Sequence, residues 1–371
     1  MCAKVKAINI KKVNKETSSP SQTDVPYQYP FKNLVFEGGG VKGIAYVGAL
    51  TRLNDEGILQ NIKRVAGTSV GAMVATLVGL GFTAAEISDI LWKINFQNFL
   101  DNSWGIIRNT NRLLTEYGWY KGDFFRDLMA DFIQQKTGDG EITFGKLEQR
   151  RKEGEPFRDI HLIGADLTTG LSVVFNAEKT PEVKIADAAR ISMSIPLFFA
   201  VVRRNDHILV DGGLLDNYAI KIFDQSNLVE DKNNIRKTDY YNKINEQLRI
   251  KKTRAKLTGI EYVYNKETLG FRLDAKDDIN LFLNQGDAPE KEIKSLYSYT
   301  KALVTTLIDF QTNTHLHSDD WQRTVYIDTL GVNSLGFDIS DTMKKALVES
   351  GYNYTSAYLD WYNNDEEKAN K

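Results

Sequence analysis

Short apolar runs alternate with amphipathic stretches along the first part of the chain. The run Asn33–Glu37 precedes three glycines, and the run Lys63–Gly67 precedes another tight turn. Between these runs, residues 41–56 carry apolar side chains at helical spacing, and residues 70–80 form a second stretch rich in Ala, Val and Leu. The order strand, helix, strand, helix at this spacing predicts a βαβ unit and a parallel sheet.

The same pattern resumes after residue 158. We predict strands over 159–165, 172–175, 207–210 and 324–328, and helices over 183–192 and 341 to about 361. Two regions do not fit the repeat and are predicted as additions to the α/β core. Residues 91–125 are rich in aromatics, which suits either a lid or apolar groove at a binding site or extra core packing. Residues 224 to about 295 are predicted as a charged helical insertion.

The chain is predicted to form one domain over residues 31–371, after a flexible leader over residues 1–30. It has 371 residues, 42% hydrophobic and 26% charged, with a formal net charge of −2. No global field favours nucleic acid, so no nucleic-acid polymer is expected as a partner. The single cysteine, Cys2, excludes an internal disulfide. No signal peptide or transmembrane run is found, so a cytoplasmic location is expected.

A candidate nucleophile lies between a predicted strand and a predicted helix, in the run Gly67-Thr68-Ser69-Val70-Gly71. In this context G-x-S-x-G presents a serine on a sharp turn, flanked by glycines where a β-carbon would collide. The amides at the start of the following helix favour negative charge near the serine. Ser69 is therefore the predicted nucleophile, and Gly67 and Gly71 are the predicted flanks of its turn.

A second candidate element follows the first strand, in the run Gly38-Gly39-Gly40-Val41-Lys42-Gly43. Its glycines match the dinucleotide fingerprint G-x-G-x-x-G. That function also needs an acidic residue at the end of the next strand, which ends at Gly67-Thr68-Ser69 instead. A P-loop does not match, because Ile44 follows the last glycine. Backbone amides in such a loop bind an oxyanion, so we predict an oxyanion hole over residues 38–43.

A candidate base follows a later strand, in Asp211-Gly212-Gly213, where the glycines permit close approach to another loop. The usual base for a serine is histidine. His161 is predicted to be a core residue of a strand, and His207 would lie roughly 13 Å from Asp211 along an extended strand. His315 and His317 lack the acidic or cysteine pattern of a metal site. A Ser-Asp dyad is therefore predicted, although a free Asp is a poor base for a hydroxyl.

Together these motifs resemble the patatin-like phospholipase family. That family has a G-G-G-x-[RK]-G loop, a G-x-S-x-G turn and a D-G-[GA] turn, in the order found here. A further block of the family is matched by Ala189-Arg190-Ile191-Ser192 and continues through Pro196 and Phe198. Lys42 stands where arginine is more frequent, which keeps the charge but loses the planar guanidinium. The resemblance covers roughly residues 33–218.

The resemblance implies a three-layer α/β/α domain with a mainly parallel sheet, and lipid ester hydrolysis through an acyl-enzyme. Ser69 would attack the ester carbonyl, Asp211 would take its proton, and the amides of Gly39, Gly40 and Val70 would hold the oxyanion. No metal or cofactor is implied. The expected partners are a phospholipid or other lipid ester and a membrane surface touched transiently. A small-molecule or protein activator and a homo-oligomer are left open.

Two alternatives to a freely active hydrolase remain. One is a ligand- or partner-gated effector that degrades membranes in toxicity or defence, because a phospholipase inside a cell must be restrained from its host's own membranes. The other is a nucleotide-binding domain, which the missing acidic residue disfavours. An amphipathic face around residues 296–310 is a further candidate for membrane attachment, although core helices share that pattern.

Overall fold

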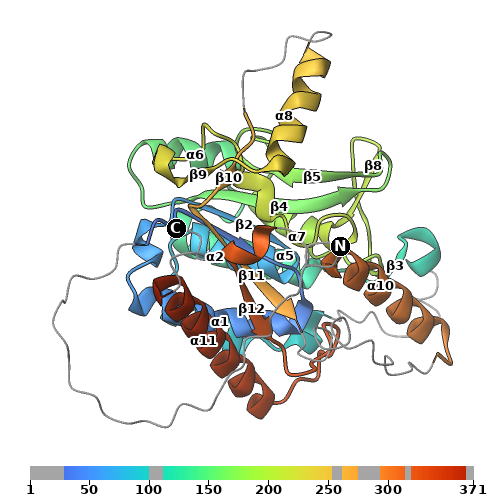
Figure 1. The fold of residues 1–371 in the computed structure, drawn as a ribbon. Helices are drawn as coiled ribbons and strands as arrows, with labels where there is room; N and C mark the ends of the chain where they lie inside the picture. Colours follow the sequence, from blue (N-terminus) through green and yellow to red (C-terminus); the bar gives the residue numbers. More distant parts are fainter. Residues whose placement is uncertain (1–28, 100–111, 253–260, 275–292, 314–318, 365–371) are drawn as a thin grey trace, which may run out of the picture.

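The largest sheet of the protein is mixed and has eight strands. Figure 1 shows this sheet with helices packed around it. The computed structural model describes residues 29–99, 112–252, 261–274, 293–313 and 319–364. The strands of the sheet are Asn33–Phe36 (β1), Arg64–Thr68 (β2), Asp159–Asp166 (β4), Leu171–Phe175 (β5), Val202–Arg204 (β7), His207–Asp211 (β8), Thr268–Asp274 (β11) and Thr324–Asp328 (β12).

The strand order is β12-β11-β1-β2-β4-β8-β7, with β5 pairing on β4 outside this path. The pairs from β12 through β4 are parallel. The pairs of β4 with β8, β8 with β7 and β4 with β5 are antiparallel. The sheet is therefore mainly parallel, with an antiparallel part at one side.

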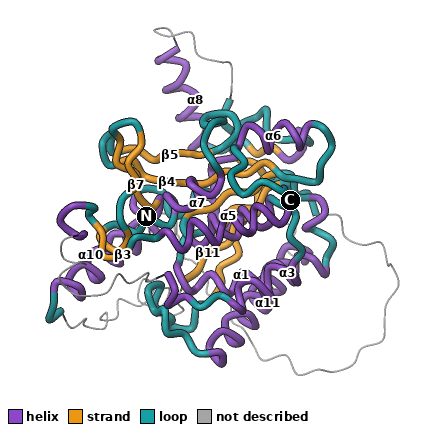
Figure 2. Tube along the Cα trace, turned by 180° about the vertical axis from the view of Figure 1, so that it is seen from behind, coloured by secondary structure: helices purple, strands orange, loops and turns teal. Residues whose placement is uncertain are grey.

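One face of the sheet carries most of the described helices. Phe36 of β1 stacks on Phe271 of β11, with ring centroids 5.4 Å apart, and meets Tyr46 of α1 edge-on at 5.2 Å. Figure 2 shows this helical layer from behind. The helices are Ala45–Asp55 (α1), Val70–Gly79 (α2), Ala84–Lys93 (α3), Asp123–Thr137 (α5), Phe144–Lys152 (α6), Ile185–Ser192 (α7), Asp239–Lys252 (α8), Leu296–Asn313 (α10) and Asp341–Asn364 (α11).

The opposite face of the sheet has a smaller apolar cluster, formed by Val35 and Ala66 with residues of the segment that follows β8. This segment contains the short 3-10 helix η5 (Ile220–Phe223) and leads to α8, whose Tyr241 hydroxyl donates to Asp224. Helices thus flank the mainly parallel sheet, which confirms the predicted α/β class.

Short elements complete the connections. Two further two-stranded sheets pair β3 with β6 in parallel and β9 with β10 antiparallel. The remaining bounds are Gly118–Tyr120 (β3), Leu197–Phe199 (β6), Ile235–Arg236 (β9), Tyr264–Asn265 (β10), Gly40–Ile44 (η1), Leu59–Asn61 (η2), Phe96–Phe99 (η3), Gly212–Leu214 (η4), Lys232–Asn234 (η6) and Asp319–Arg323 (η7).

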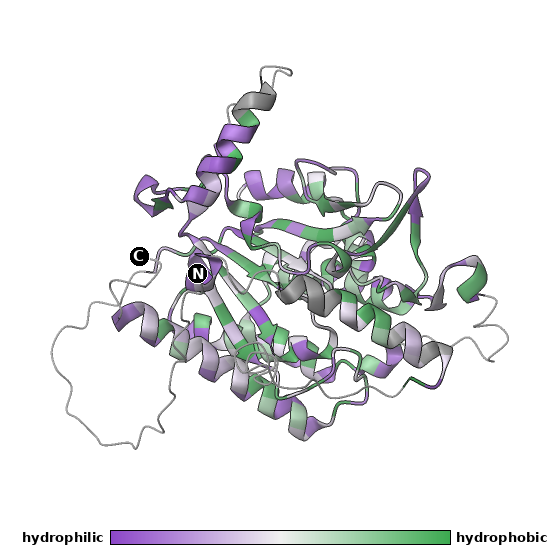
Figure 3. Ribbon diagram, turned by 45° about the vertical axis from the view of Figure 1, so that its right-hand side comes forward, coloured by the Kyte–Doolittle hydropathy of each residue, from purple (hydrophilic) through white to green (hydrophobic). Residues whose placement is uncertain are grey.

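The region expected to be a helical insertion, 224 to about 295, differs from that expectation. It contains α8, which Figure 3 shows as a mostly hydrophilic helix projecting from the body. It also contains β11, which is buried along its whole length and pairs with both β1 and β12. The sheet therefore runs through this region. This strand was not predicted from the sequence, because charged stretches surround it and Arg272 and Asp274 interrupt its apolar pattern.

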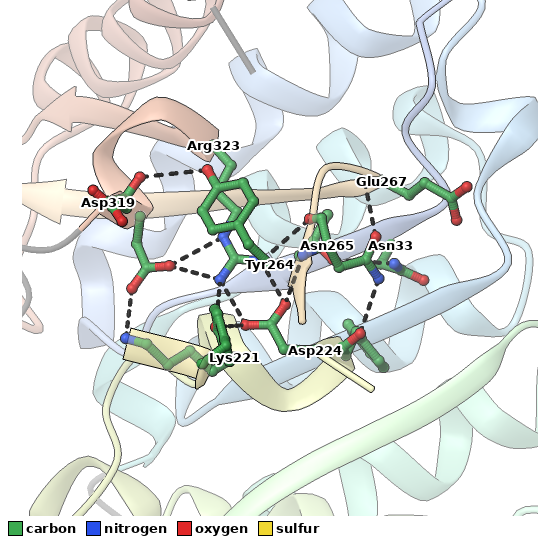
Figure 4. Close-up of polar contacts among 12 residues, drawn as sticks. Asn33, Lys221, Asp224, Tyr264, Asn265, Glu267, Asp319 and Arg323 are labelled. Carbon is green, nitrogen blue, oxygen red and sulfur yellow. Dashed lines mark hydrogen bonds and ion pairs between the residues drawn. The ribbon is translucent and has the colours of Figure 1, made fainter. Parts of the chain in front are cut away.

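A buried ionic network connects the segment after β8 to the far side of the sheet (Figure 4). The guanidinium of Arg323 is fully buried and pairs with both carboxylate oxygens of Asp224, at 2.6 and 2.7 Å. It also donates to Asp320 at 2.6 Å, and Lys221 binds the same carboxylate. The ring of Tyr264 lies 4.3 Å from the guanidinium carbon. Two cations face two carboxylates, so the network balances its charge internally.

The described part of the aromatic region is divided between the main core and the surface, where Trp92, Tyr117 and Phe124 are exposed. Phe96, Phe99 and Phe125 are buried, and Phe99 meets both of the others edge-on at 5.5 Å. These residues therefore favour core packing, while residues 100–111 lie outside the described part. Residues 1–28 of the expected leader also lie outside it. Tyr29 is buried and its ring lies 5.8 Å from that of Tyr362 in α11.

Candidate active site

The register of the sheet brings the predicted nucleophile and base together. β2 pairs with the first part of β4 and ends at Thr68, opposite Ile163. β8 runs in the opposite direction and ends at Asp211, opposite Gly164. β5 occupies the other edge of β4, so β2 and β8 lie along the same edge and run toward each other. Ser69 follows Thr68 directly, and the two candidate residues therefore meet in the middle of β4.

Ser69 lies on a strained turn at the start of α2. Its φ is 55° and its ψ is −126°, a conformation that L-residues rarely adopt. A β-carbon at Gly67 would lie 2.1 Å from the carbonyl oxygen of Gly71, and one at Gly71 would lie 2.3 Å from that of Phe36. Only glycine fits at either position. The two glycines that flank Ser69 in the G-x-S-x-G pattern are thus required because no side chain fits at their positions.

The backbone and side chain of Ser69 have separate partners. Its amide donates to the Ser192 hydroxyl at 2.9 Å, and that hydroxyl donates to the carbonyl of Ile163 at 2.6 Å. Its own hydroxyl lies 3.5 Å from the sulfur of Met193. The start of α2, where the helix dipole favours negative charge, is immediately adjacent. The end of α7 therefore holds the turn in place from one side.

Asp211 is buried, with 2% of its surface exposed. Its Oδ1 accepts from the Gly213 amide at 2.7 Å, and its own amide donates to the carbonyl of Ser194 at 2.9 Å. Its Oδ2 has no hydrogen bond of ordinary geometry to any described residue. Burial raises the pKa of Asp211 to about 7, while the Gly213 amide and the nearby Ser69 hydroxyl lower it. The carboxyl is thus a much stronger base than an exposed aspartate.

The glycine loop lies directly against Ser69. A β-carbon at Gly38 would be 3.1 Å from the β-carbon of Ser69, and one at Gly40, whose φ is 54°, would be 1.9 Å from the carbonyl oxygen of Ser334. Gly43 packs on the side chain of Val70 in the same way. The loop therefore lies in tight contact with Ser69, and side chains at its glycines would collide with Asn217, Ser334 and Val70 around it.

The amides of the glycine loop are not equivalent, which narrows the predicted oxyanion hole of residues 38–43. The amides of Gly38, Val41 and Lys42 donate to the carbonyls of Asn217, Ser334 and Gly39, respectively. Among the described residues, the amides of Gly39 and Gly40 in the loop and of Val70 after the serine have no such partner. These three are the donors that remain for a ligand at this site.

Asn217 connects the glycine loop to the aspartate turn. Its side-chain amide donates to the Gly38 carbonyl at 3.2 Å and to Glu37 at 3.4 Å, and its backbone carbonyl accepts from Gly38 at 3.1 Å. Its side-chain oxygen would lie 3.0 Å from a β-carbon at Gly213. Glu37 itself is buried, which raises its pKa to about 7 against the lowering effect of Arg272. Asn217 thus sets the spacing of the two loops.

The described histidines have partners away from Ser69. His207 lies at the start of β8 and pairs with Asp166 at 2.6 Å. His161 is buried, pairs with Asp159 at 3.0 Å and contacts the Asn176 amide at 3.1 Å. The other two predicted candidates, His315 and His317, lie outside the described residues.

Neither a metal cluster nor a membrane-spanning helix was found in the described part of the chain. No three His, Cys, Asp or Glu side chains there converge as metal ligands would. None of the described helices is both long enough and apolar enough to cross a bilayer.

Three residues at the site had no role assigned from sequence. Ser192 and Ser194 bind the backbones of Ser69 and Asp211 from the end of α7, and Asn217 joins the two loops. Ser192 belongs to the block that resembles the family, and Ser194 follows it closely. The block therefore pointed to this part of the chain but did not indicate which backbones the two residues bind. Asn217 follows Asp211 by six residues in a stretch that carried no local signal.

Comparison with known proteins shows which family and which relatives this chain is similar to. The family model described as "Patatin-like phospholipase" matches residues 34–224. The Bacillus subtilis protein YqhO is 27% identical over 342 residues, which cover 88% of this chain and 97% of YqhO. A protein of Invertebrate iridescent virus 6 with the name "Probable lipid hydrolase 463L" is 26% identical over 52% of this chain and 63% of its own length.

A solved structure shares the fold. The crystal structure of VipD from Legionella pneumophila aligns with a TM-score of 0.53 and 16% sequence identity. The alignment covers 89% of this chain and 67% of the VipD chain. It therefore extends beyond the region of the family model.

Proposed function

This chain belongs to the patatin-like phospholipase family, and from that premise we propose that it is a lipid acyl hydrolase with a Ser69–Asp211 dyad. The substrate would be a phospholipid, a lysophospholipid or another lipid carrying a carboxylic ester. The similarity to a protein named as a lipid hydrolase supports this class of substrate.

The first half of the reaction would form an acyl-enzyme. The hydroxyl oxygen of Ser69 attacks the ester carbonyl carbon while its proton passes to Oδ2 of Asp211. The carbonyl oxygen gains negative charge and accepts hydrogen bonds from the amides of Gly39, Gly40 and Val70. The bond to the alcohol then breaks, and the alcohol leaves with the proton from Asp211.

The second half would release the fatty acid. A water molecule attacks the acyl carbon and gives its proton to Asp211, with the same three amides holding the oxyanion. The bond to the Ser69 oxygen then breaks, and that oxygen recovers the proton. The carboxyl thus acts once as base and once as acid in each half, which suits a group with a pKa near 7.

The observation that carries this proposal is the state of Asp211. It is a buried carboxyl beside the Ser69 hydroxyl, it has one oxygen without a hydrogen bond of ordinary geometry, and its pKa is raised to about 7. A buried carboxylate used only for structure is normally saturated with hydrogen bonds. An aspartate in this condition can take a proton from serine, which answers the objection that a free aspartate is too weak a base.

The test is hydrolysis of mixed phospholipid vesicles and of a soluble short-chain ester by the wild type and by the variants Ser69→Ala and Asp211→Ala. Removing one member of a catalytic pair lowers kcat by a factor of about 10⁴ or more. We expect both variants to lose activity on both substrates. Ser172→Ala and Asp338→Ala, at exposed positions, are matched controls that should keep it. Equal activity of Ser69→Ala and wild type would reject the dyad.

A further inference from the structure

Helix α10 has one face buried in the protein and an apolar stripe on the adjoining face. Thr300 and Val304 are 2% and 4% exposed, whereas Tyr299, Leu303 and Leu307 are 53%, 40% and 42% exposed. The last three are spaced by four residues, so they follow one line along the helix. Three large apolar side chains in a row are thus held at the surface. We call these three residues the α10 stripe.

The position of α10 relates the stripe to the candidate active site. The helix packs against η4, the turn that begins immediately after Asp211. Figures 1 and 2 show α10 and the short strand β3 on the same side of the molecule. Leu114 and Tyr117, just before β3, are also exposed, at 71% and 45%. Several large apolar side chains are therefore exposed on the side where α10 packs against the aspartate turn.

The charge of the helix favours a lipid surface as the partner. Over its full length, Leu296–Asn313, the helix has two charged residues, Lys301 and Asp309, and no net charge. A segment of this kind is not repelled by anionic lipid and carries little charge to desolvate on contact.

The size of the stripe disfavours a second copy of the chain. A stable protein interface removes about 800 Å² from each partner. A whole aromatic side chain supplies only about 150–250 Å², and the three members of the stripe are about half exposed. A fluid lipid surface needs no matching partner shape, so a few inserted apolar side chains suffice for reversible contact.

We propose that the α10 stripe is the surface by which this protein docks on lipid assemblies, next to the turn that carries Asp211. The inference deepens the proposed function and rests on it. Docking of a lipid surface next to the turn after Asp211 serves catalysis if Asp211 acts on a lipid ester. Docking through α10 would place the lipid beside the candidate site without any membrane-spanning segment.

The experiment measures vesicle binding without turnover. The full chain with Ser69→Ala is mixed with vesicles of equal parts phosphatidylcholine and phosphatidylglycerol, and the bound fraction is determined by flotation. Adding Leu303→Ser and Leu307→Ser should lower the partition coefficient by about tenfold or more, because two apolar side chains are lost from the contact. Adding Leu303→Met and Leu307→Met instead should preserve binding.

A matched pair elsewhere provides the control. Leu167 and Leu171 lie in the hairpin of β4 and β5 and are 46% and 64% exposed. Replacing both by serine should leave the partition coefficient unchanged. An equal loss with this pair, or no loss with the α10 pair, would overturn the proposal. So would a dimer, seen by light scattering, that the α10 variant loses while its vesicle binding is unaltered.

Activity separates this inference from the proposed function. With Ser69 intact, the Leu303→Ser and Leu307→Ser variant should hydrolyse a soluble short-chain ester at the wild-type rate and lose activity only on vesicles. Its thermal unfolding should match that of the wild type, since both side chains lie at the surface. If the wild type cleaved no ester, the proposed function would fail, while the binding comparison would still decide the role of the stripe.

Discussion

At the scale of single residues, burial decides the chemistry of Asp211. An exposed aspartate has a pKa near 4, so at neutral pH it is a weak base and holds too few protons to act as an acid. In this protein burial raises that pKa to about 7, although the Gly213 amide and the Ser69 hydroxyl act in the other direction. The proposed function therefore depends on a carboxyl whose charged form is disfavoured by burial. Ionising this group should lower the stability of the folded protein.

Asp211→Asn should stabilise the protein at alkaline pH. The folded state holds a proton on Asp211 up to about pH 7, whereas the unfolded chain loses it near pH 4. The wild type therefore loses stability as the pH rises between these values, by up to about 4 kcal/mol. Denaturant unfolding of both proteins should show the variant more stable above about pH 8, with the gap closing below about pH 4.

The same pKa should govern the activity of the wild type. On a soluble ester, kcat/KM should fall about tenfold per pH unit below pH 7 and level off above it, because only the carboxylate can accept the serine proton. Burial also raises the pKa of Glu37 to about 7, so the stability difference between wild type and Asp211→Asn is the measurement that isolates the aspartate. A stability gap that did not change with pH would contradict the assignment.

At the scale of elements, the candidate site depends on how three loops are held relative to one another. The glycine loop follows β1, the serine turn follows β2 and the aspartate turn follows β8. The end of α7 fixes the backbones of Ser69 and Asp211, and Asn217 ties the glycine loop to the aspartate turn. Misplacement of a reacting group by about 1 Å can lower a rate 100-fold. These contacts should therefore matter more to turnover than to binding.

Asn217→Ala should lower kcat by about tenfold to 100-fold with little change in KM. The variant loses the hydrogen bonds to Gly38 and Glu37 that hold the amides of Gly39 and Gly40 opposite the serine. Steady-state kinetics on a soluble ester would separate the two parameters.

Asn265→Ala is the matched control, because Asn265 is also buried and its side chain binds two backbone groups. Both variants should lose about 1–3 kcal/mol of stability. Only the change at Asn217 should lower kcat. A fall in kcat shared by both would mean that loss of stability, and not loop position, explains the effect.

At the scale of the whole molecule, the network around Arg323 joins parts of the chain far apart in sequence. It connects Asp224, just after the segment that carries Asp211, to Asp320 and β12 at the far edge of the sheet. The family model ends at residue 224, so the network joins the family region to the strands that follow it. The later part of the chain is thus continuous with the core that positions the candidate site.

Arg323→Met should destabilise the protein by about 3–5 kcal/mol, since it leaves the buried carboxylates of Asp224 and Asp320 without their main cation. Arg151→Met removes a partly exposed pair with Glu148, whose side chains are 34% and 19% exposed, and should change stability by no more than about 1 kcal/mol. Urea denaturation measures both. Similar losses for the two variants would show that the buried network contributes no more than a surface ion pair.

Local physical constraints explain what could be predicted from the sequence. Short apolar runs ending in glycine identified β1, β2 and β8, because a buried strand followed by a tight turn has few sequence solutions, and a longer apolar run identified β4. The serine turn was identifiable for the same reason, since Gly67 and Gly71 leave no space for a β-carbon. The α/β class followed from the order of these elements.

Other features were decided only by tertiary structure, because they depend on residues far apart in the chain. β11 joins the sheet beside β1 although its own sequence is interrupted by charge, and buried partners such as Glu37 make that placement favourable. Which loop amides remain for a ligand is set by the carbonyls of Asn217 and Ser334. The raised pKa of Asp211 likewise comes from what surrounds it, because desolvation is a property of the packed fold and not of a motif.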